Sequence, residues 1–505
     1  MRKINAITLN IIANTLSFGI SLIISFLLTP YITKTVGIEA YGLIGLANSF
    51  IGYINVLTAA LNSMASRFIV LELHKDNTHK ANVYFSSVLL SNTIFAIFIT
   101  LPAIWLISNI HVLNLSDNLI HDAKITFSLI FINFVISLLS ALFGVVLYAK
   151  NILWKGSLRT AESNLIRVAL ILIFFSCVSY RIYNVVLATL ISSLYVIGFN
   201  IYYTHKYIPS FRISTKNFSF SAVGELISAG IWNSITKLSQ ILLDGLDLLL
   251  SNLFISGVMT GNVSIAKTVP SLYVSVVAII SDSFYPEFLD LYSKNEQKKL
   301  LQSINNSITV LSSISGICLS ILFVYAKEFY TLWVPDCDSL ILSRITYLSA
   351  GTVLISGCVY SLFYVFSLTN KVRNNSIVLF ITGFLSAITT FFALKFTSLG
   401  VYAIVGVSSV FGIIRNLTFT PLYAAKCLSL KWSTFYPVII KNLLIISVLM
   451  LLFSLVKTFL YPTTWILLIC NGLINLVAGS VLVFLVSLNQ DQKLRILKRI
   501  KKKFS

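Results

Sequence analysis

Fourteen apolar segments of about 20 residues each, separated by short polar loops, constrain this chain more than any other feature. A helix needs about 20 apolar residues to cross the hydrocarbon core of a bilayer. The mean hydropathy is +0.89, and only 11% of the 505 residues are charged. These values exclude an ordinary soluble protein and predict an all-α polytopic membrane protein with fourteen transmembrane helices. We expect the spans at 8–33, 41–64, 83–108, 123–148, 164–180, 184–204, 224–255, 263–288, 306–326, 340–367, 376–395, 400–425, 438–459 and 464–487.

Basic residues are distributed unevenly between the loops. Every second loop carries several Lys and Arg residues, among them Arg67, Lys150, Arg159, Lys206 and Lys294, whereas the loops between them are nearly free of both. Positively charged loops stay in the cytoplasm, so both termini are predicted to be cytoplasmic. The cations form no continuous stripe, so the net charge of +20 indicates orientation in a membrane and no nucleic-acid partner.

The chain contains a weak internal repeat. Asn14 and Gly42 align with Asn233 and Gly261 at an offset of 219 residues. Six spans per copy give both copies the same orientation, as two parallel lobes around a central cavity. We therefore expect lobes at 1–218 and 219–430, two additional transmembrane helices at 431–488, and a basic cytoplasmic tail at 489–505.

The seventh predicted span carries a polar stripe. Steps of three and four residues place its six members on one helical face: Asn233, Lys237, Gln240, Asp244, Asp247 and Ser251. A charge near the bilayer centre costs about 2.5–3.5 kcal/mol, so this face avoids lipid. It either lines a water-filled pathway or forms a polar seam between helices. A second, uncharged stripe in the first span has the same two interpretations: Asn10, Asn14, Ser17, Ser21, Ser25 and Thr29.

Three further cations fall inside predicted spans: Arg167, Lys267 and Arg415. With Lys237 they make four intramembrane cations against two anions, which suits an anionic ligand. Lys237 and Arg415 lie too deep to reach the interface, so they are the preferred ligand contacts, with Asn233 and Gln240 beside them. Arg167 either binds ligand or extends to the inner interface, and Lys267 either binds ligand or pairs with Asp247. Asp244 either couples transport to an ion or pairs with Lys237.

Motifs of soluble catalysis are absent from the sequence. It contains no GxxxxGK[ST], HExxH or GxSxG, and loops of about ten to twenty residues are too short for a catalytic domain. The six cysteines lie far apart, without the spacing of a disulfide framework or a metal site. We therefore expect no catalytic residue, metal or cofactor.

Two segments, TVGIEAYGLIGLANSF (35–50) and LLDGLDLLLSNLFISGVMTGNVSIAK (242–267), resemble the polysaccharide repeat-unit flippases (Wzx type) of the multidrug/oligosaccharidyl-lipid/polysaccharide exporter superfamily. A third segment also resembles sequences of that family: FYPEFLDLYSKNEQKKL (284–300). The resemblance implies two six-helix lobes, alternating access, and export of an undecaprenyl-pyrophosphate-linked oligosaccharide across a bacterial plasma membrane. It also implies a polymerase and glycosyltransferases as pathway partners.

The first span departs from one branch of this superfamily. Lipid II flippases carry arginines there, whereas residues 5–33 of this chain hold no charge. This difference favours a capsule, O-antigen or teichoic-acid unit as the lipid-linked cargo. Two other functions remain open at this point: a membrane glycosyl- or acyltransferase of polymer assembly, and a drug or ion antiporter of the same superfamily.

Overall fold

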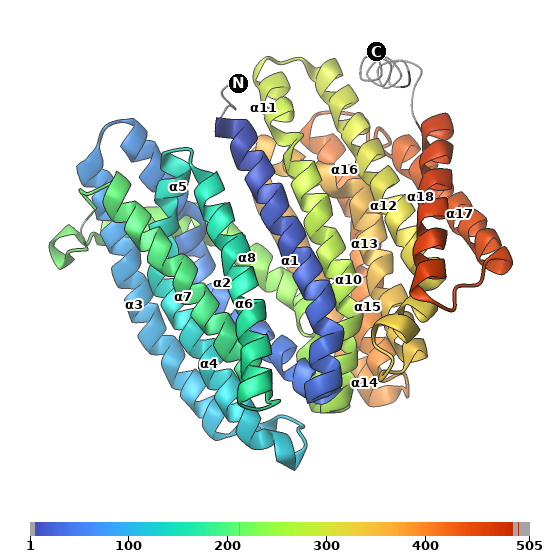
Figure 1. Cartoon of the computed structure of the whole chain (residues 1–505). Helices are drawn as coiled ribbons and strands as arrows, with labels where there is room; N and C mark the ends of the chain where they lie inside the picture. Colours follow the sequence, from blue (N-terminus) through green and yellow to red (C-terminus); the bar gives the residue numbers. More distant parts are fainter. Residues whose placement is uncertain (1–5, 212, 488–492, 494–505) are drawn as a thin grey trace, which may run out of the picture. The chain divides into compact units, whose positions relative to one another are not determined.

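The computed structural model describes residues 6–211, 213–487 and 493, and all regular structure within them is helical (Figure 1). Lipid offers no hydrogen-bond partner to the backbone, so each apolar segment satisfies its own N–H and C=O groups by forming a helix. Thirteen helical segments in these ranges are long and apolar enough to cross a membrane. The predicted all-α membrane fold is thereby confirmed. The predicted basic tail at 489–505 lies outside the described residues, except for Lys493.

The chain divides into two compact units, Met1–Ser264 and Ile265–Ser505. The first unit contains α1 (Ala6–Val36), α2 (Ile38–His74), α3 (Thr78–Ser108), α4 (Ile120–Ser140), α5 (Val145–Ala149), α6 (Leu153–Cys177), α7 (Ile182–Tyr207), α8 (Phe220–Gln240), α9 (Asp247–Phe254) and the start of α10 (Gly257–Asp282). Short 3₁₀ turns lie at Ile110–Val112, Asp117–Leu119, Ala141–Gly144 and Thr215–Asn217. The predicted lobe boundaries at 218 and 430 follow the sequence repeat rather than compactness, and they stay a prediction.

The core of the first unit forms around α2. Near one end, Leu43 and Leu46 of α2 pack in the same buried cluster as Phe127 of α4. Near the other end, Leu61 of α2 shares a cluster with Phe85 of α3. Burial of large apolar side chains on several faces of α2 explains why this helix is central to the unit.

The second unit contains the rest of α10, then α11 (Tyr285–Ser293), α12 (Gln297–Trp333), α13 (Ser339–Leu368), α14 (Val372–Phe396), α15 (Val401–Leu417), α16 (Phe419–Cys427), α17 (Tyr436–Phe459) and α18 (Trp465–Val486). Leu311 of α12, Leu362 of α13 and Phe435, just before α17, are fully buried in its main cluster. The long helix α12 therefore packs against both α13 and α17 (Figure 1).

Polar contacts attach the last two helices to α12. Lys457 of α17 forms a partly buried salt bridge with Glu328 of α12 at 2.7 Å. Asn475 of α18 donates a hydrogen bond to the Tyr325 hydroxyl at 3.0 Å, and Asn471 donates to the Leu460 carbonyl at 2.8 Å. Lipid cannot compete for these polar groups, so they hold α17 and α18 against α12.

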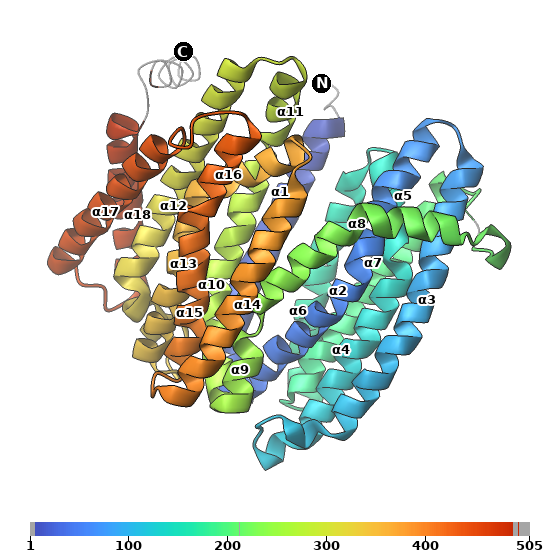
Figure 2. The same ribbon diagram turned by 180° about the vertical axis from the view of Figure 1, so that it is seen from behind.

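The predicted seventh span at 224–255 is not one continuous helix. It consists of α8, a π-helical stretch η5 (Ile241–Gly245) and α9. Within the first unit, α8 lies obliquely across α2 (Figure 2). At the break, the Tyr53 hydroxyl of α2 donates to the Gly245 carbonyl at 3.0 Å. This hydrogen bond satisfies a carbonyl at the irregular turn, and the sequence pattern alone does not reveal it.

Candidate functional site

The buried face of α8 is built for close contact with α2. Ala222, Leu226, Gly230 and Ser234 recur every fourth residue and are all buried. A Cβ at Gly230 would lie 1.9 Å from the Ala60 carbonyl oxygen, so glycine is required at this crossing. One turn later, the Ser234 hydroxyl donates to the Val56 carbonyl at 2.8 Å. These contacts fix which way the opposite face of α8 points.

Asn233 lies at the edge of this contact. Its side-chain amide donates to the Ser63 hydroxyl of α2 at 3.0 Å, and the side chain is half-buried. Its bonding therefore fits the polar-seam interpretation. Ligand contact by Asn233, predicted from the sequence, stays a prediction.

The exposed face of α8 and η5 carries Lys237, Gln240 and Asp244. The side chain of Lys237 makes no hydrogen bond or ion pair with any residue that the structure describes. Asp244 is exposed at the π-helical stretch and takes part in polar interactions of its own. All three residues are exposed, and their predicted role in ligand binding or coupling stays a prediction.

The lower part of the predicted stripe turns away from that face. A π-helical turn adds a residue, which rotates everything after it. Asp247 and Ser251 of α9 are consequently buried, with 3% and 0% exposure. The expectation that all six polar residues share one face is therefore wrong beyond Asp244.

The C-terminal end of α9 is held by the loop between α3 and α4. The backbone N–H of Asn114 donates to Asn252 Oδ1 at 3.0 Å, and Asn252 Nδ2 donates back to the Asn114 carbonyl at 3.3 Å. Ser116, in the same loop, donates from its N–H and its hydroxyl to the Glu39 carboxylate at 2.8 and 2.6 Å. The segment after the bulge is thus anchored at its far end.

Close contact also occurs where α2 meets the start of α10. Gly42 and Gly261, the pair that the repeat aligns, face each other directly, and a Cβ at Gly42 would lie 2.7 Å from the Gly261 nitrogen. Three residues along each helix, the Cβ position of Gly45 lies 2.7 Å from the Ser264 hydroxyl. Small residues allow these two backbones to approach, as is common between membrane helices.

A row of cations along α6 was only partly anticipated. Lys155, Arg159 and Arg167 are separated by four and eight residues, which places them on one side of the helix. Arg159 was assigned to a loop, but it lies within α6, where it bonds Glu162 at 2.6 Å and the Tyr195 hydroxyl at 3.0 Å. The four-residue spacing from Lys155 was the signal that could have revealed this row.

Arg167 differs from the other two cations of the row. Its side chain is half-buried, and its Nε is buried without a hydrogen-bond partner among the described residues. Lys155, in contrast, donates to the Tyr207 hydroxyl at 2.5 Å. Arg159 also leaves its Nε without a partner, but its Nη1 bonds Glu162 and Tyr195, whereas the Arg167 side chain makes no hydrogen bond or ion pair with any described residue.

The stripe of the first span turns out to be largely a contact surface. Asn10 accepts a hydrogen bond from the Trp154 N–H at 2.9 Å and donates to Asn151 at 2.7 Å. Farther along α1, the Ser21 hydroxyl accepts from Asn164 of α6 at 2.7 Å. Of the two interpretations left open for this stripe, these contacts favour helix packing.

In the second unit, Arg415 of α15 is buried with 8% exposure. Its Nη2 donates to Asn375 Oδ1 of α14 at 2.6 Å, and its Nη1 donates to Asn416 Oδ1 at 3.2 Å. The guanidinium carbon also lies 5.5 Å from the ring centre of Phe363. All these partners are neutral, and no carboxylate among the described residues pairs with Arg415.

A buried guanidinium with neutral partners keeps its positive charge uncompensated. Such a charge is costly in a membrane unless a ligand or a water-filled space faces it. Asn416 in turn donates to the Ser356 hydroxyl at 2.8 Å, so one amide that supports Arg415 is itself held in place. The arrangement presents a fixed cation, which suits recognition of an anion.

Lys267 of α10 is half-buried and takes part in polar interactions. Asp247 belongs to the first unit and Lys267 to the second, so their predicted ion pair stays a prediction. The structure therefore brings Lys237, Gln240 and Asp244 together in one unit, and it places Arg415 in the other.

The fold is shared with solved structures of membrane transporters and flippases. Lipid II flippase MurJ in an inward closed conformation matches with a TM-score of 0.70 at 16% identity, over 94% of this chain and 98% of that chain. An inward-facing multidrug resistance MATE family transporter matches with a TM-score of 0.66 at 14% identity, over 83% and 94%. At identities this low, the matches show a shared fold and no more.

The chain belongs to the polysaccharide biosynthesis protein family, whose model matches residues 7–292. The uncharacterized membrane protein EpsK of Bacillus subtilis (strain 168) is 27% identical over 496 residues, which is 98% of each chain. The resemblance inferred from the sequence segments is thereby confirmed, and the chain is a multi-pass membrane protein of polysaccharide biosynthesis.

Proposed function

We propose that this protein is a flippase that moves an undecaprenyl-pyrophosphate-linked oligosaccharide from the inner to the outer leaflet of a bacterial plasma membrane. The cargo is a capsule, O-antigen or teichoic-acid unit, and the mechanism is alternating access. Family membership and the shared fold support the class of protein. The observation that carries the proposal is Arg415, a buried cation with only neutral partners among the described residues.

The cargo explains why cations are needed in the membrane. A sugar headgroup with a pyrophosphate would lose its hydrogen bonds to water in hydrocarbon, at a cost of several kcal/mol for each unsatisfied group. Arg415 and Lys237 offer charge-assisted donors to the phosphates, with Arg167 and Lys267 as further cations and Gln240 as a neutral donor for sugar hydroxyls. These residues substitute for water along the pathway.

The driving force need not come from ATP. An interior-negative membrane potential favours outward movement of a negative charge by about 2.3 kcal/mol per charge per 100 mV. Asp244, exposed at the π-helical stretch, is the residue we propose for coupling to proton or sodium entry. Asp244→Asn is expected to reduce the dependence of export on the ion gradient while leaving some export. Loss of the protein from the membrane would instead identify Asp244 as a structural partner.

Deletion of the gene distinguishes a flippase from a transferase by the lipid-linked oligosaccharide that accumulates. A flippase defect leaves a complete lipid-linked oligosaccharide on the inner leaflet. A defect in a glycosyl- or acyltransferase of polymer assembly leaves an incomplete one. We expect the complete form, and incomplete oligosaccharide would refute the proposed function. We also propose that the polymerase and glycosyltransferases of the same pathway act beside this protein.

A further inference from the structure

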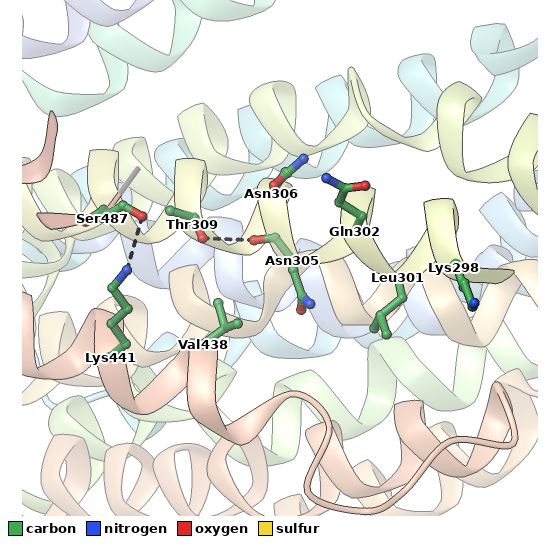
Figure 3. Close-up of a pocket in the computed structure, with 9 residues that line it drawn as sticks. All are labelled: Lys298, Leu301, Gln302, Asn305, Asn306, Thr309, Val438, Lys441 and Ser487. Atoms are coloured by element: carbon green, nitrogen blue, oxygen red, sulfur yellow. Dashed lines mark hydrogen bonds between the residues drawn. The ribbon is translucent and has the colours of Figure 1, made fainter. Parts of the chain in front are cut away.

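A polar pocket of about 310 Å³ lies in the second unit, between α12 and the last two helices. Figure 3 shows Lys298 and Lys441 at its two ends, with Asn305 and Gln302 between them. The remaining lining residues are Leu301, Asn306, Thr309, Val438 and Ser487. This volume is at the lower end of small-ligand sites, which span about 300–1,000 Å³.

The pocket is positively charged. Two lysines line it, and no lining residue is a carboxylate. The side chain of Lys298 makes no hydrogen bond or ion pair with any described residue. The side-chain ammonium of Lys441 donates only to the Ser487 carbonyl, at 3.3 Å. The adjacent Lys299, by contrast, pairs with Glu296 at 2.8 Å and does not line the pocket. Two cations facing one cavity without a counter-ion favour an anionic ligand.

Two lining polar groups are buried and have no partner among the described residues. These are the Oδ1 of Asn305 and the hydroxyl of Ser487, whose residue is 5% exposed. A buried polar atom without a hydrogen bond is costly, by about 1–3 kcal/mol. Both groups can accept hydrogen bonds, so the ligand that completes this site also carries donors, such as hydroxyl groups.

An apolar groove of about 500 Å³ adjoins the pocket on α17 and α18. The two cavities share one residue, Lys441. The groove is lined by Pro437, Ile440, Leu444, Ile445, Val448, Leu482 and Val486. A charged pocket joined to an apolar groove along membrane helices has the amphipathic pattern of a phospholipid.

The pocket ends where α12 and α17 come into direct contact. Farther along α12, a Cβ at Gly316 would lie 2.7 Å from Ile446 of α17, so the two helices are in direct contact there. Before that contact they leave the pocket open, at the ends where both helices begin. In the orientation proposed from the basic loops, those ends face the cytoplasm.

We propose that this pocket and groove bind an anionic phospholipid of the inner leaflet, with phosphatidylglycerol as the best-fitting class. The phosphate lies beside Lys441, where the pocket joins the groove, and an acyl chain follows the groove. The glycerol hydroxyls bond Asn305 or Ser487, and Lys298 at the other end of the pocket adds positive charge. Basic pockets between transmembrane helices on the cytoplasmic side are known sites for anionic headgroups. Neither lysine belongs to the proposed transport site, so this inference stands apart from the proposed function.

The test measures binding of fluorescent phosphatidylglycerol to the purified full chain in detergent. Phosphatidylcholine with the same acyl chains is the competitor. We expect a preference for phosphatidylglycerol that falls about fivefold with either Lys298→Gln or Lys441→Gln, and about 25-fold with both. Lys299→Gln is the matched control and is expected to leave binding unchanged. An equal loss with Lys299→Gln, or no preference over phosphatidylcholine, would overturn the proposal.

Two further binding experiments test the identity of the ligand and the role of the groove. Leu444→Trp fills the groove from an exposed position and is expected to weaken phosphatidylglycerol binding at an unchanged melting temperature. Unchanged binding would remove the acyl-chain part of the proposal. Undecaprenyl pyrophosphate at equal concentration is expected not to displace phosphatidylglycerol. If it does, the site belongs to the transported lipid and the resident-lipid proposal fails.

Discussion

Arg415→Gln separates a ligand-binding role from a structural role for the buried guanidinium. The substitution removes hydrogen bonds to Asn375 and Asn416, each about 1.5–3 kcal/mol for a charged donor, and a contact with Phe363 of about 0.5–2 kcal/mol. It also removes the cost of a charge in the membrane, about 2.5–3.5 kcal/mol. Glutamine can keep one of the two bonds. The opposing effects leave a net change in stability between about −1.5 and +2.5 kcal/mol, which is close to zero.

The variant is therefore expected to remain inserted and folded while losing export. Loss of a charged contact to pyrophosphate costs about 2 kcal/mol or more, so surface polymer is expected to fall about tenfold or more. The assay compares surface polymer with protein recovered after heating and size-exclusion chromatography. Lys395→Gln, an exposed cation at the far end of α14, is the matched control and keeps export. Aggregated Arg415→Gln protein, or normal export at normal expression, would refute the reasoning.

Three other predictions follow from the packing and the topology. Gly230→Ala places a methyl group 1.9 Å from the Ala60 carbonyl oxygen and is expected to destabilise the α8–α2 contact by about 1–3 kcal/mol. The control Gly224→Ala meets nothing within 4 Å and is expected to leave the melting temperature unchanged. Equal melting temperatures of the two variants would contradict this account. Glu328→Gln leaves the half-buried Lys457 without its anion and is expected to cost about 1–3 kcal/mol; Glu328→Gln combined with Lys457→Met recovers part of the loss, and a double variant no more stable than the single one would count against this ion pair. In a chain without its six native cysteines, a cysteine at position 116 is expected to react with an impermeant thiol reagent outside intact cells and one at 214 is not; external labelling at 214 would overturn the proposed cytoplasmic termini.

The sequence predicted the helices well because their cause is local. A run of about 20 apolar residues forms a membrane helix whatever its neighbours are, and thirteen such helices lie in the described residues. The charge at Arg415 was also recognisable as intramembrane from its position in such a run. Its neutral partners Asn375 and Ser356 were not, because they come from other helices and bond it directly or through Asn416 only after folding.

The break in the seventh span was beyond sequence reasoning for a similar reason. Spacing arguments assume one uninterrupted helix, and they placed Asp247 on the same face as Lys237. At the π-helical stretch, Gly245 accepts a hydrogen bond from Tyr53, which lies almost two hundred residues away in the sequence and on another helix. Arg159 shows the opposite case. Its four-residue spacing from Lys155 was visible, but the positive-loop rule assigned Arg159 to a loop.

Reconstituted translocation tests the central claim most directly. Purified protein in sealed vesicles receives a fluorescent undecaprenyl-pyrophosphate-linked oligosaccharide, and a membrane-impermeant quencher reports how much reaches the outer face. We expect movement with the native chain and none above empty vesicles with Lys237→Gln combined with Arg415→Gln, at equal reconstituted protein. Equal movement by the native chain and the double variant would contradict a cationic pathway for the pyrophosphate.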